Sequence, residues 1–450
     1  MPEKSRSFHI ETLGCPKNAV DSDKIVATLI ADGLVGAGRA EDADLIVVNT
    51  CAFIEAARQE SIDTVLALSD AKRIDAKLAV TGCMAERYGD ELAAALPEVD
   101  AIVGFGDAGS IASTVGMVSP VTMKRKPVGV RDLLELPRPT STSPWAYLKI
   151  AEGCDRACAF CAIPTFRGKQ RSRTSDSILT EARGLVANGV SELVLVAQDL
   201  AWYGRDIGTS GALSPLLRSL DALTAEGLSR IRLLYLYPSE VQDPLVSTML
   251  TLDSVVPYFD LSLQHAAPDL LRRMKRWGNA ERFLATIDDI RERQPNAVFR
   301  SSFISGFPGE TEDHHEQLLR FLEAAQLDWA GFFAYSSEAG TTAAELDGAV
   351  DDSVIRERLR ELAATQEPIT AAARIAIIGS TIEVLVDGVD EDGIAVGRSY
   401  REAPEIDGVV RLADADFVRS GAAVVAIVTD VEGPDLDATA QRVAPRSVGG

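Results

Sequence analysis

Six cysteines are the residues of this sequence best suited to chemistry, and three of them crowd into one short segment. Cys154, Cys158 and Cys161 follow the spacing C-x3-C-x2-C directly after the apolar run WAYLKIAEG. Zinc sites usually combine paired cysteines with further ligands at similar spacing, but no second pair follows and the four histidines lie at other spacings. Three thiolates on one loop can instead bind three irons of a 4Fe–4S cluster and leave the fourth iron open. We therefore predict a cluster that activates a bound molecule, with zinc as the alternative.

The other three cysteines, Cys15, Cys51 and Cys83, lie 36 and 32 residues apart in the sequence. A buried, inert thiol is the usual explanation for a scattered cysteine. Each of these cysteines, however, follows an apolar run typical of a strand, and the carboxyl ends of parallel strands meet at one edge of a sheet. Gly14 and Gly82 precede two of them and permit tight turns. We therefore predict that the three thiols converge on a second 4Fe–4S cluster.

Residues 6–118 are expected to form the domain that positions these scattered cysteines. Apolar runs alternate there with helical patterns, which is typical of a small parallel sheet covered by helices. The expected strands are Phe8–Leu13, Leu45–Val48 and Leu78–Val80, and the expected helices are Val20–Ile30, Ile54–Leu68 and Glu86–Leu96. The segment 119–139 is rich in Pro, Ser, Thr and basic residues and is expected to be a linker.

A second alternating series, over residues 140–371, positions the C-x3-C-x2-C segment. Its expected strands are Ala146–Ala151, Glu192–Ala197, Ile231–Tyr235, Phe259–Leu263, Val298–Ile304 and Trp329–Ala334. The expected helices are Asp176–Ala187, Ser214–Ala225, Pro268–Lys275, Ala280–Glu292, Glu312–Ala325 and, leading out of the series, Val354–Ala373. Six strand–helix units favour a TIM-like barrel or partial barrel, although the spacing does not decide whether the barrel closes.

Residues 373–443 have a different sequence pattern, in which short apolar runs alternate with Asp- and Gly-rich turns. The runs are Thr381–Val386, Ile394–Val396, Val409–Leu412 and Ala422–Val428. This pattern predicts a small all-β barrel. The expected fold class is thus α/β multidomain, with a small parallel α/β N-terminal domain, a TIM-like partial β/α barrel core and an all-β C-terminal barrel.

The composition and net charge of the chain indicate where the protein resides and which partners it can bind. Apolar residues make up 46% of the chain, the start MPEKSRSFHIETLG lacks the apolar stretch of a signal peptide, and no later segment reaches membrane-spanning length. We therefore expect a cytoplasmic protein with no membrane partner. The net charge of −22 opposes nonspecific nucleic-acid binding. From Ala373 onward, 14 acidic residues stand against 7 Arg and no Lys, a net charge of −7, which favours a basic protein partner over RNA. A solvated acidic surface without a partner is the alternative.

The two cysteine sets and the terminal β-barrel together resemble the methylthiotransferase family of radical S-adenosylmethionine (SAM) enzymes. The resemblance covers nearly the whole chain and implies an N-terminal methylthiotransferase domain, a radical SAM core and a C-terminal TRAM domain. Several stretches resemble the branch that modifies a ribosomal protein, namely LGCPKNAVDSD, AQDLAWYGRD, LYLYP and LSLQHAAPDLLRRMKR. The tRNA-modifying branch typically has a different tripeptide where this chain has Pro16-Lys17-Asn18, and it lacks the histidine found here at position 265.

The resemblance implies a specific reaction. SAM would chelate the open iron of the cluster at Cys154, Cys158 and Cys161, whose electron generates a radical from SAM. The cluster at the scattered cysteines would hold the sulfur to be inserted. The expected product carries a methylthio group on the β-carbon of an aspartate in the decoding-centre protein of the small ribosomal subunit. The alternatives are methylthiolation of an adenosine in tRNA and an iron–sulfur electron carrier or cluster-delivery protein.

The resemblance also implies further site residues and partners. A reducing partner such as flavodoxin or ferredoxin is expected, whereas tRNA is not. The candidate SAM-binding residues are Phe160, Gln198, Asp199, Gly306 and Glu310. Simple packing is the alternative for the phenylalanine, and a plain helix-entry turn is the alternative for the glycine and glutamate. His265 and Lys149 also fall on the rim of the expected barrel, where we expect them to be structural hydrogen bonders. No general base is assigned.

Overall fold

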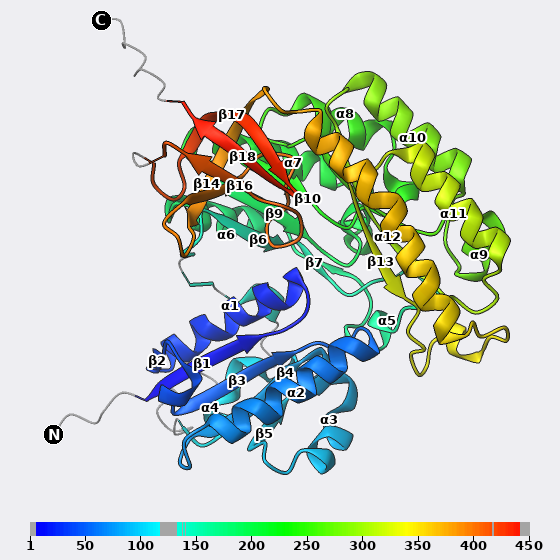
Figure 1. Ribbon diagram of the computed structural model, residues 1–450. Coiled ribbons are helices and arrows are strands. Elements are labelled where there is room, and N and C mark those ends of the chain that lie inside the picture. Colours follow the sequence, from blue (N-terminus) through cyan, green and yellow to red (C-terminus); the bar gives the residue numbers. More distant parts are fainter. Residues whose placement is uncertain (1–5, 118–132, 137, 140, 416–417, 442–450) are drawn as a thin grey trace, which may run out of the picture.

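Three units make up the chain in the computed structural model, which describes residues 6–117, 133–136, 138–139, 141–415 and 418–441 (Figure 1). An N-terminal α/β domain lies against a larger β/α barrel, and a small β-barrel packs on this larger barrel. Most of the expected linker, 119–139, lies outside the described residues. Within the described ranges, no helix combines the length and the apolarity that crossing a bilayer requires.

The N-terminal domain is a parallel sheet with the strand order β2-β1-β3-β4-β5. Its strands are β1 (Ser7–Thr12), β2 (Val35–Gly36), β3 (Leu45–Thr50), β4 (Lys77–Gly82) and β5 (Ala101–Val103), and its helices are α1 (Pro16–Ala31), α2 (Glu55–Ala71), α3 (Cys83–Ala95) and the short α4 (Ile111–Thr114). This is the doubly wound order in which ligands bind where the chain reverses direction, between the carboxyl ends of β1 and β3. The parallel sheet is therefore confirmed, and its reversal point lies at the scattered cysteines.

The core is a barrel of six parallel strands that does not close. Its two three-stranded sheets are β6 (Trp145–Lys149), β9 (Glu192–Val196) and β10 (Arg230–Leu233), and β11 (Tyr258–Gln264), β12 (Val298–Ser305) and β13 (Trp329–Ala334). Isolated parallel bridges, Ile231 to Val255 and Leu236 to Leu261, join the two sheets. Over the described residues β6 and β13 do not pair, so the barrel is partial.

Helices cover the outer face of the partial barrel, where alternate strand residues are fully buried. They are α6 (Ser175–Ala187), α7 (Leu213–Asp221), α8 (Asp243–Thr251), α9 (Pro268–Arg273), α10 (Ala280–Arg293) and α11 (Glu312–Ala325). Two short strands, β7 (Ala151–Glu152) and β8 (Arg171–Ser172), and one turn of helix, α5 (Ile163–Phe166), frame the C-x3-C-x2-C segment. The predicted strand–helix alternation is confirmed, and α8 is an additional helix.

The C-terminal unit follows the long helix α12 (Asp352–Ile375) and is a closed barrel with the strand order β14-β15-β16-β18-β17. Its strands are β14 (Thr381–Val389), β15 (Ala395–Arg398), β16 (Val410–Ala413), β17 (Ala423–Glu432) and β18 (Asp435–Ala440). The expected all-β barrel is confirmed. The strand β18 was not expected because its sequence, DLDATA, contains a single large apolar residue.

The loop 399–407 of this barrel, which we call the barrel plug, closes the amino-terminal end of the core strands. Ala403 is fully buried inside the core among the inward-facing side chains of five strands. The Tyr258 hydroxyl donates a 2.6 Å hydrogen bond to the Asp407 carboxylate in the plug. Arg232 of β10 donates to the carbonyl oxygen of Tyr400 at 2.8 Å. The C-terminal barrel therefore completes the interior of the core, at the opposite end of the strands from the cysteine loop.

Candidate functional site

The carboxyl ends of β1, β3 and β4 bring three cysteines together, as the sequence predicts. Asn18, in the first turn of α1, donates hydrogen bonds to the carbonyl oxygens of Leu13 (2.9 Å) and Thr50 (3.0 Å), which precede two of them. The same side chain accepts a contact from the third thiol, at 3.6 Å from its sulfur. One asparagine thus spans all three strand ends. We call Cys15, Cys51 and Cys83 the strand-end triad.

Two glycines allow the backbone to pass close to this triad. Gly14 has φ +93°, and a Cβ there would lie 2.7 Å from the Cβ of Cys51. Gly82 has φ +94°, and a Cβ there would lie 2.5 Å from the carbonyl oxygen of Thr50. A side chain at either place would be strained and would also clash. The cysteines can therefore sit side by side only with glycine before them.

Positive charge surrounds the strand-end triad. Arg167 is buried and donates to the sulfur of Cys83 at 3.1 Å and to the Asn18 Oδ1 at 2.6 Å. Burial opposes ionisation of Cys15, but Lys17 and Arg167 together hold the pKa of this thiol below its ordinary value. Burial raises the pKa of Cys51 to about 12. Cationic neighbours favour the thiolate form, which is the form that binds metal.

The other three cysteines, Cys154, Cys158 and Cys161, lie on the loop between β7 and α5, and we call them the loop triad. The loop starts at Gly153, which has φ +77° and whose Cβ would lie 2.2 Å from the carbonyl oxygen of Lys169. A hydrogen bond of 3.2 Å from the amide of Cys161 to the carbonyl of Cys158 closes the turn. Arg276 donates to the sulfur of Cys158 at 3.3 Å. Each triad therefore has an arginine side chain bonded to a cysteine sulfur.

The donor chemistry of both places fits a 4Fe–4S cluster. All six cysteines are free thiols. No three His, Cys, Asp or Glu side chains of the described part of the chain converge closely enough to hold a single metal ion. In a 4Fe–4S cluster each thiolate binds its own iron, so that three thiols around a larger group are the arrangement needed. Arginine N–H groups directed at cysteine sulfurs are the kind of outer contact that orients and tunes such a group.

The two triads lie on either side of the short helix α5. This helix begins two residues after Cys161, and its Phe166 packs with Cys83 and Met84 in one apolar cluster. Arg167, the next residue, reaches the strand-end triad. The chain between Cys161 and Arg167 therefore connects the two triads directly.

Buried ion pairs fix this arrangement. Arg167 donates to Glu152 Oε2 at 2.9 Å, and Lys149 of β6 donates to the same oxygen at 2.7 Å. Lys149 also pairs with Asp21 of α1. Together the four side chains join the N-terminal domain to the core next to the triads. Lys149 is thus a structural hydrogen bonder, as expected.

A second cation lies beside Cys15. The Lys17 Nζ is 3.5 Å from the ring centroid of Tyr235, a residue at the carboxyl end of β10 with φ +63°. A left-handed backbone is costly for a tyrosine and is typical of functional sites. Lys17 makes no ion pair with a carboxylate among the residues that the structure describes. Its charge is therefore available to a bound molecule.

The expected SAM-binding pair, Gln198 and Asp199, lies on the rim near the loop triad. Gln198 donates to Glu152 Oε1 at 2.7 Å, and Asp199 accepts from Arg156 at 2.7 Å. One oxygen of each side chain, Gln198 Oε1 and Asp199 Oδ1, is buried without a hydrogen-bond partner among the described residues. Arg156 also stacks on Tyr237, 3.8 Å from the ring centroid. The pair is held in place and keeps two acceptors free.

Glu310 differs from this pair because its carboxylate stabilises the turn in which Glu310 itself lies. It accepts hydrogen bonds from the amides of Gly306 and Phe307 and an ion pair of 3.1 Å from Arg358. Gly306 has φ +85°, and a Cβ there would lie 2.4 Å from the Cδ1 of Ile355. These contacts favour the helix-entry turn over a direct ligand contact. Phe160 is partly buried and packs against the core, which leaves its two interpretations open.

His265 is fully buried, and its Nδ1 accepts a 3.1 Å hydrogen bond from the amide of Ala267. Burial lowers the pKa of His265 to about 3, so that the ring is neutral. This agrees with the expected structural role. Three further residues of the site, Arg156, Arg167 and Arg276, were not predicted. Of these, only Arg156 could have been identified from the sequence, because it lies inside the cysteine loop. Arg167 and Arg276 lie outside that loop and reach the sulfurs from elsewhere in the chain.

Comparison with known families divides the chain in the same way as its fold. Residues 7–104 match the uncharacterized protein family UPF0004, residues 148–322 match the radical SAM superfamily, and residues 378–440 match the TRAM domain. The match to the radical SAM superfamily implies a 4Fe–4S cluster and SAM.

Several relatives are similar over nearly their whole length. The ribosomal protein uS12 methylthiotransferase RimO of Cutibacterium acnes is 43% identical, over 96% of this chain and 97% of that protein. The proteins of the same name from Kineococcus radiotolerans and Streptomyces coelicolor are 42% and 40% identical, with at least 96% of each chain covered. Among solved structures, the radical SAM methyltransferase TsrM of Kitasatospora setae has a TM-score of 0.52 at 16% identity, over 75% of this chain and 77% of that chain. This likeness concerns the fold alone.

Proposed function

The chain belongs to the RimO family of ribosomal protein uS12 methylthiotransferases, and from this premise we propose that it attaches a methylthio group to the β-carbon of an aspartate in uS12. The observation that carries the proposal is the convergence of two cysteine triads at the carboxyl ends of strands, on either side of α5. A methylthiotransferase needs one site that activates SAM and a second site that holds sulfur, and the chain offers two donor sets of the required kind.

We assign the loop triad to the SAM-activating cluster and the strand-end triad to a second, auxiliary 4Fe–4S cluster. When bound, these groups supply one-electron chemistry and sulfur, which acid–base side chains cannot supply to an unactivated C–H bond. The corresponding domains are a methylthiotransferase domain over residues 6–118, a linker over 119–139, a radical SAM core over 140–371 and a TRAM domain over 373–443.

The residues around the triads position and shield the reactants. We propose that Gln198 Oε1 and Asp199 Oδ1 accept hydrogen bonds from the amino group of SAM, because both are buried acceptors that lack a partner among the described residues. Phe160, Gly306 and Glu310 remain proposals for the adenosine side. Of these, Glu310 would act through the turn that it stabilises.

Lys17 is proposed to hold the carboxylate of the substrate aspartate. It lies beside Cys15, its ammonium group is stacked on Tyr235, and no described carboxylate neutralises it. An aspartate bound there would present its β-carbon next to the strand-end triad. An adenosine base, which is the substrate in the tRNA alternative, offers no carboxylate to this cation.

The remaining partners follow from the reaction and the charge. The loop cluster needs an electron from a reducing protein, which we propose is of the flavodoxin or ferredoxin type. Ribosomal proteins are basic because they lie on ribosomal RNA, and the net charge of −22 suits such a substrate. We expect the enzyme in the cytoplasm, where ribosomes are found.

The test is a direct assay of the product. The reconstituted protein is incubated with SAM, a reductant and either uS12 or tRNA, and the products are analysed by mass spectrometry. We expect one methylthio group on one aspartate of uS12 and unmodified tRNA. Methylthio-adenosine in the tRNA would support the alternative substrate, and no SAM cleavage at all would support an electron carrier.

A further inference from the structure

Among the residues that the structure describes, none pairs with the outer edge of β1 along the half of the strand that leads to Cys15. β1 pairs with β3 from Phe8 to Thr12, but it pairs with β2 only at Ser7 and Phe8. Beyond β2, the last bond on this side runs from the amide of Ala37 to the carbonyl of Phe8, at 2.7 Å. No further strand of the described chain lies along this edge.

The backbone N–H and C=O groups of successive residues in a strand point alternately to its two sides, which identifies the groups of β1 that face the open edge. The amide of Leu13 donates to Asn49 of β3 at 2.9 Å, so that the odd-numbered residues of β1 direct their N–H and C=O groups to β3. The even-numbered residues direct theirs to the opposite side. Ile10 and Thr12 therefore present an N–H and a C=O each to the open edge, two residues apart, as a pairing strand requires.

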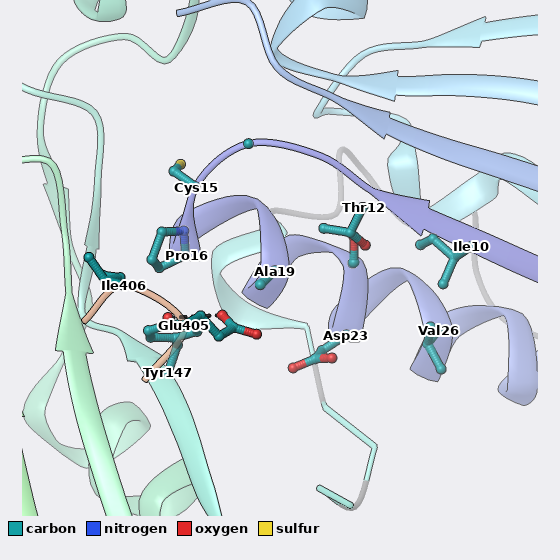
Figure 2. Close-up of a pocket in the computed structure, with 12 residues that line it drawn as sticks. Ile10, Thr12, Cys15, Pro16, Ala19, Asp23, Val26, Tyr147, Glu405 and Ile406 are labelled. Carbon is teal, nitrogen blue, oxygen red and sulfur yellow. Dashed lines mark hydrogen bonds between the residues drawn. The ribbon is translucent and has the colours of Figure 1, made fainter. Parts of the chain in front are cut away.

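This edge forms one wall of a cavity of about 440 Å³ that ends at Cys15. Ile10, Thr12 and Gly14 line it along β1, and residues of α1 line it beside them. The opposite wall is Tyr147 of the core together with Glu405 and Ile406 of the barrel plug (Figure 2). All three domains therefore meet around a space that leads from the unpaired edge to the strand-end triad.

The charge of the cavity is negative. Glu405 is exposed, accepts a 3.0 Å hydrogen bond from the Tyr147 hydroxyl and has no cation within ion-pair distance in the described ranges. Its backbone has φ +64°, a strained conformation that directs it into the cavity in Figure 2. Asp23 also lines the space, but Arg138 already neutralises it. An anion would be repelled beside Glu405, whereas a lysine or arginine side chain would find an unpaired carboxylate there.

We propose that this edge and cavity bind the protein substrate, as an extended basic segment that adds to β1 as a further strand. The inference rests on the proposed function, because it takes the substrate to be a lysine- and arginine-rich ribosomal protein. Main-chain hydrogen bonds to Ile10 and Thr12 would fix the register of the segment, and Glu405 would select a basic side chain. Because β1 runs toward Cys15, a strand in this register leads the target residue to the strand-end triad.

Site-resolved hydrogen exchange on the reconstituted wild-type enzyme, with and without uS12, tests the pairing. The amides of Ile10 and Thr12 should exchange quickly in the free enzyme and at least about tenfold more slowly in the complex. The amides of His9 and Glu11, which face β3, should be slow in both and serve as internal controls. Quick exchange of Ile10 and Thr12 in a complex that forms would overturn the proposal. Slow exchange in the free enzyme would also overturn it, because the chain itself would then occupy the edge.

Two substitutions with the same change of charge test the cavity. Glu405→Lys should weaken the binding of uS12 by about tenfold or more, since it places a like charge against the basic segment. Glu391→Lys is the matched control, because Glu391 is an exposed acid of the same domain outside the cavity, and it should change binding by less than about threefold. Equal effects of the two variants would refute the role of Glu405.

A synthetic segment of uS12 around the modified aspartate separates this inference from the proposed function. N-methylation of alternate backbone amides removes the donors of a pairing strand without altering the enzyme, and should weaken binding by about tenfold. If every singly N-methylated segment binds as well as the parent while uS12 is still methylthiolated, the strand addition is wrong and the function stands. If uS12 is neither bound nor modified, the proposed function fails, and this inference fails with it.

Discussion

Replacing Glu192 with Gln should destabilise the junction between the core and the C-terminal barrel by about 3 kcal/mol at pH 7. Glu192 is fully buried and accepts hydrogen bonds of 2.8 Å from both Arg232 of the core and Arg398 of β15. Removal of one member of a buried charge group leaves the others uncompensated, which typically costs about 3–5 kcal/mol. The pKa of Glu192 gives a second value for this free energy, and the two values are of similar size. Burial opposes ionisation, but Arg398 and Arg232 lower the pKa of Glu192 from 4.5 to about 2, and a lowering of this size corresponds to about 3 kcal/mol.

The assay is urea denaturation followed by hydrogen exchange at β15, because a chain of three domains need not unfold in one step. The pKa of this carboxylate is lower in the folded state than in the unfolded state. Its contribution is therefore present above pH 4.5 and is lost as the pH falls toward about 2. The difference between wild type and variant should accordingly shrink in acid.

A matched control lies at the same junction. Glu383 of β14 pairs with Arg230 at 3.1 Å, but its side chain is 59% exposed, so Glu383→Gln should cost at most about 1 kcal/mol. If Glu192→Gln costs no more than Glu383→Gln, burial does not set the strength of this junction, and the reasoning is refuted.

Three further predictions concern the site. Replacing the loop triad with alanines should halve the bound iron, from about eight atoms, and abolish SAM cleavage. Replacing the strand-end triad should also halve the iron but leave SAM cleavage measurable. A full iron content in either variant would contradict the presence of two clusters. Lys17→Met should raise the KM for uS12 by about tenfold without affecting reductive SAM cleavage. Lys72→Met, at a half-buried lysine that follows α2, is the control and should change neither. Burial lowers the pKa of His265 from 6.5 to about 3, so that the unfolded state binds the extra proton and stability falls as the pH drops below about 6.5. His265→Gln should flatten this part of the pH profile of the melting temperature, and an unchanged slope would show that His265 is not its source.

The long elements of the fold were predictable because their patterns are strong. Trp329–Ala334 and Glu312–Ala325 form a strand and a helix with the expected bounds. Val35–Gly36 and Ala101–Val103 were missed because two or three residues show no periodicity, although they are the edges of the first sheet. Closure of the core was not predictable either, since pairing between distant strands leaves no trace in spacing.

The site was predictable where residue type alone carries the chemistry. Cysteines have few other uses in such a chain, so both triads could be identified from their positions. Asn18 and Arg167 could not, because their role consists of contacts with thiols 65 and 84 residues away. The Glu310 carboxylate shows the opposite case: its position on the rim suggested a ligand contact, but the amides of its own turn are closer.

The barrel plug also affects how the chain can fold during synthesis. The Arg232 Nη groups and the Tyr258 hydroxyl lie inside the core and bond to residues 399–407, which leave the ribosome well after the last core strand. Domains generally fold as units while the chain emerges from its N-terminus. This core cannot do so, because its interior keeps unsatisfied polar groups until more than four hundred residues have been made. Its final assembly should therefore be a late, nearly post-translational event, and a chain cut short before the plug should be retained by chaperones rather than accumulate as a folded core.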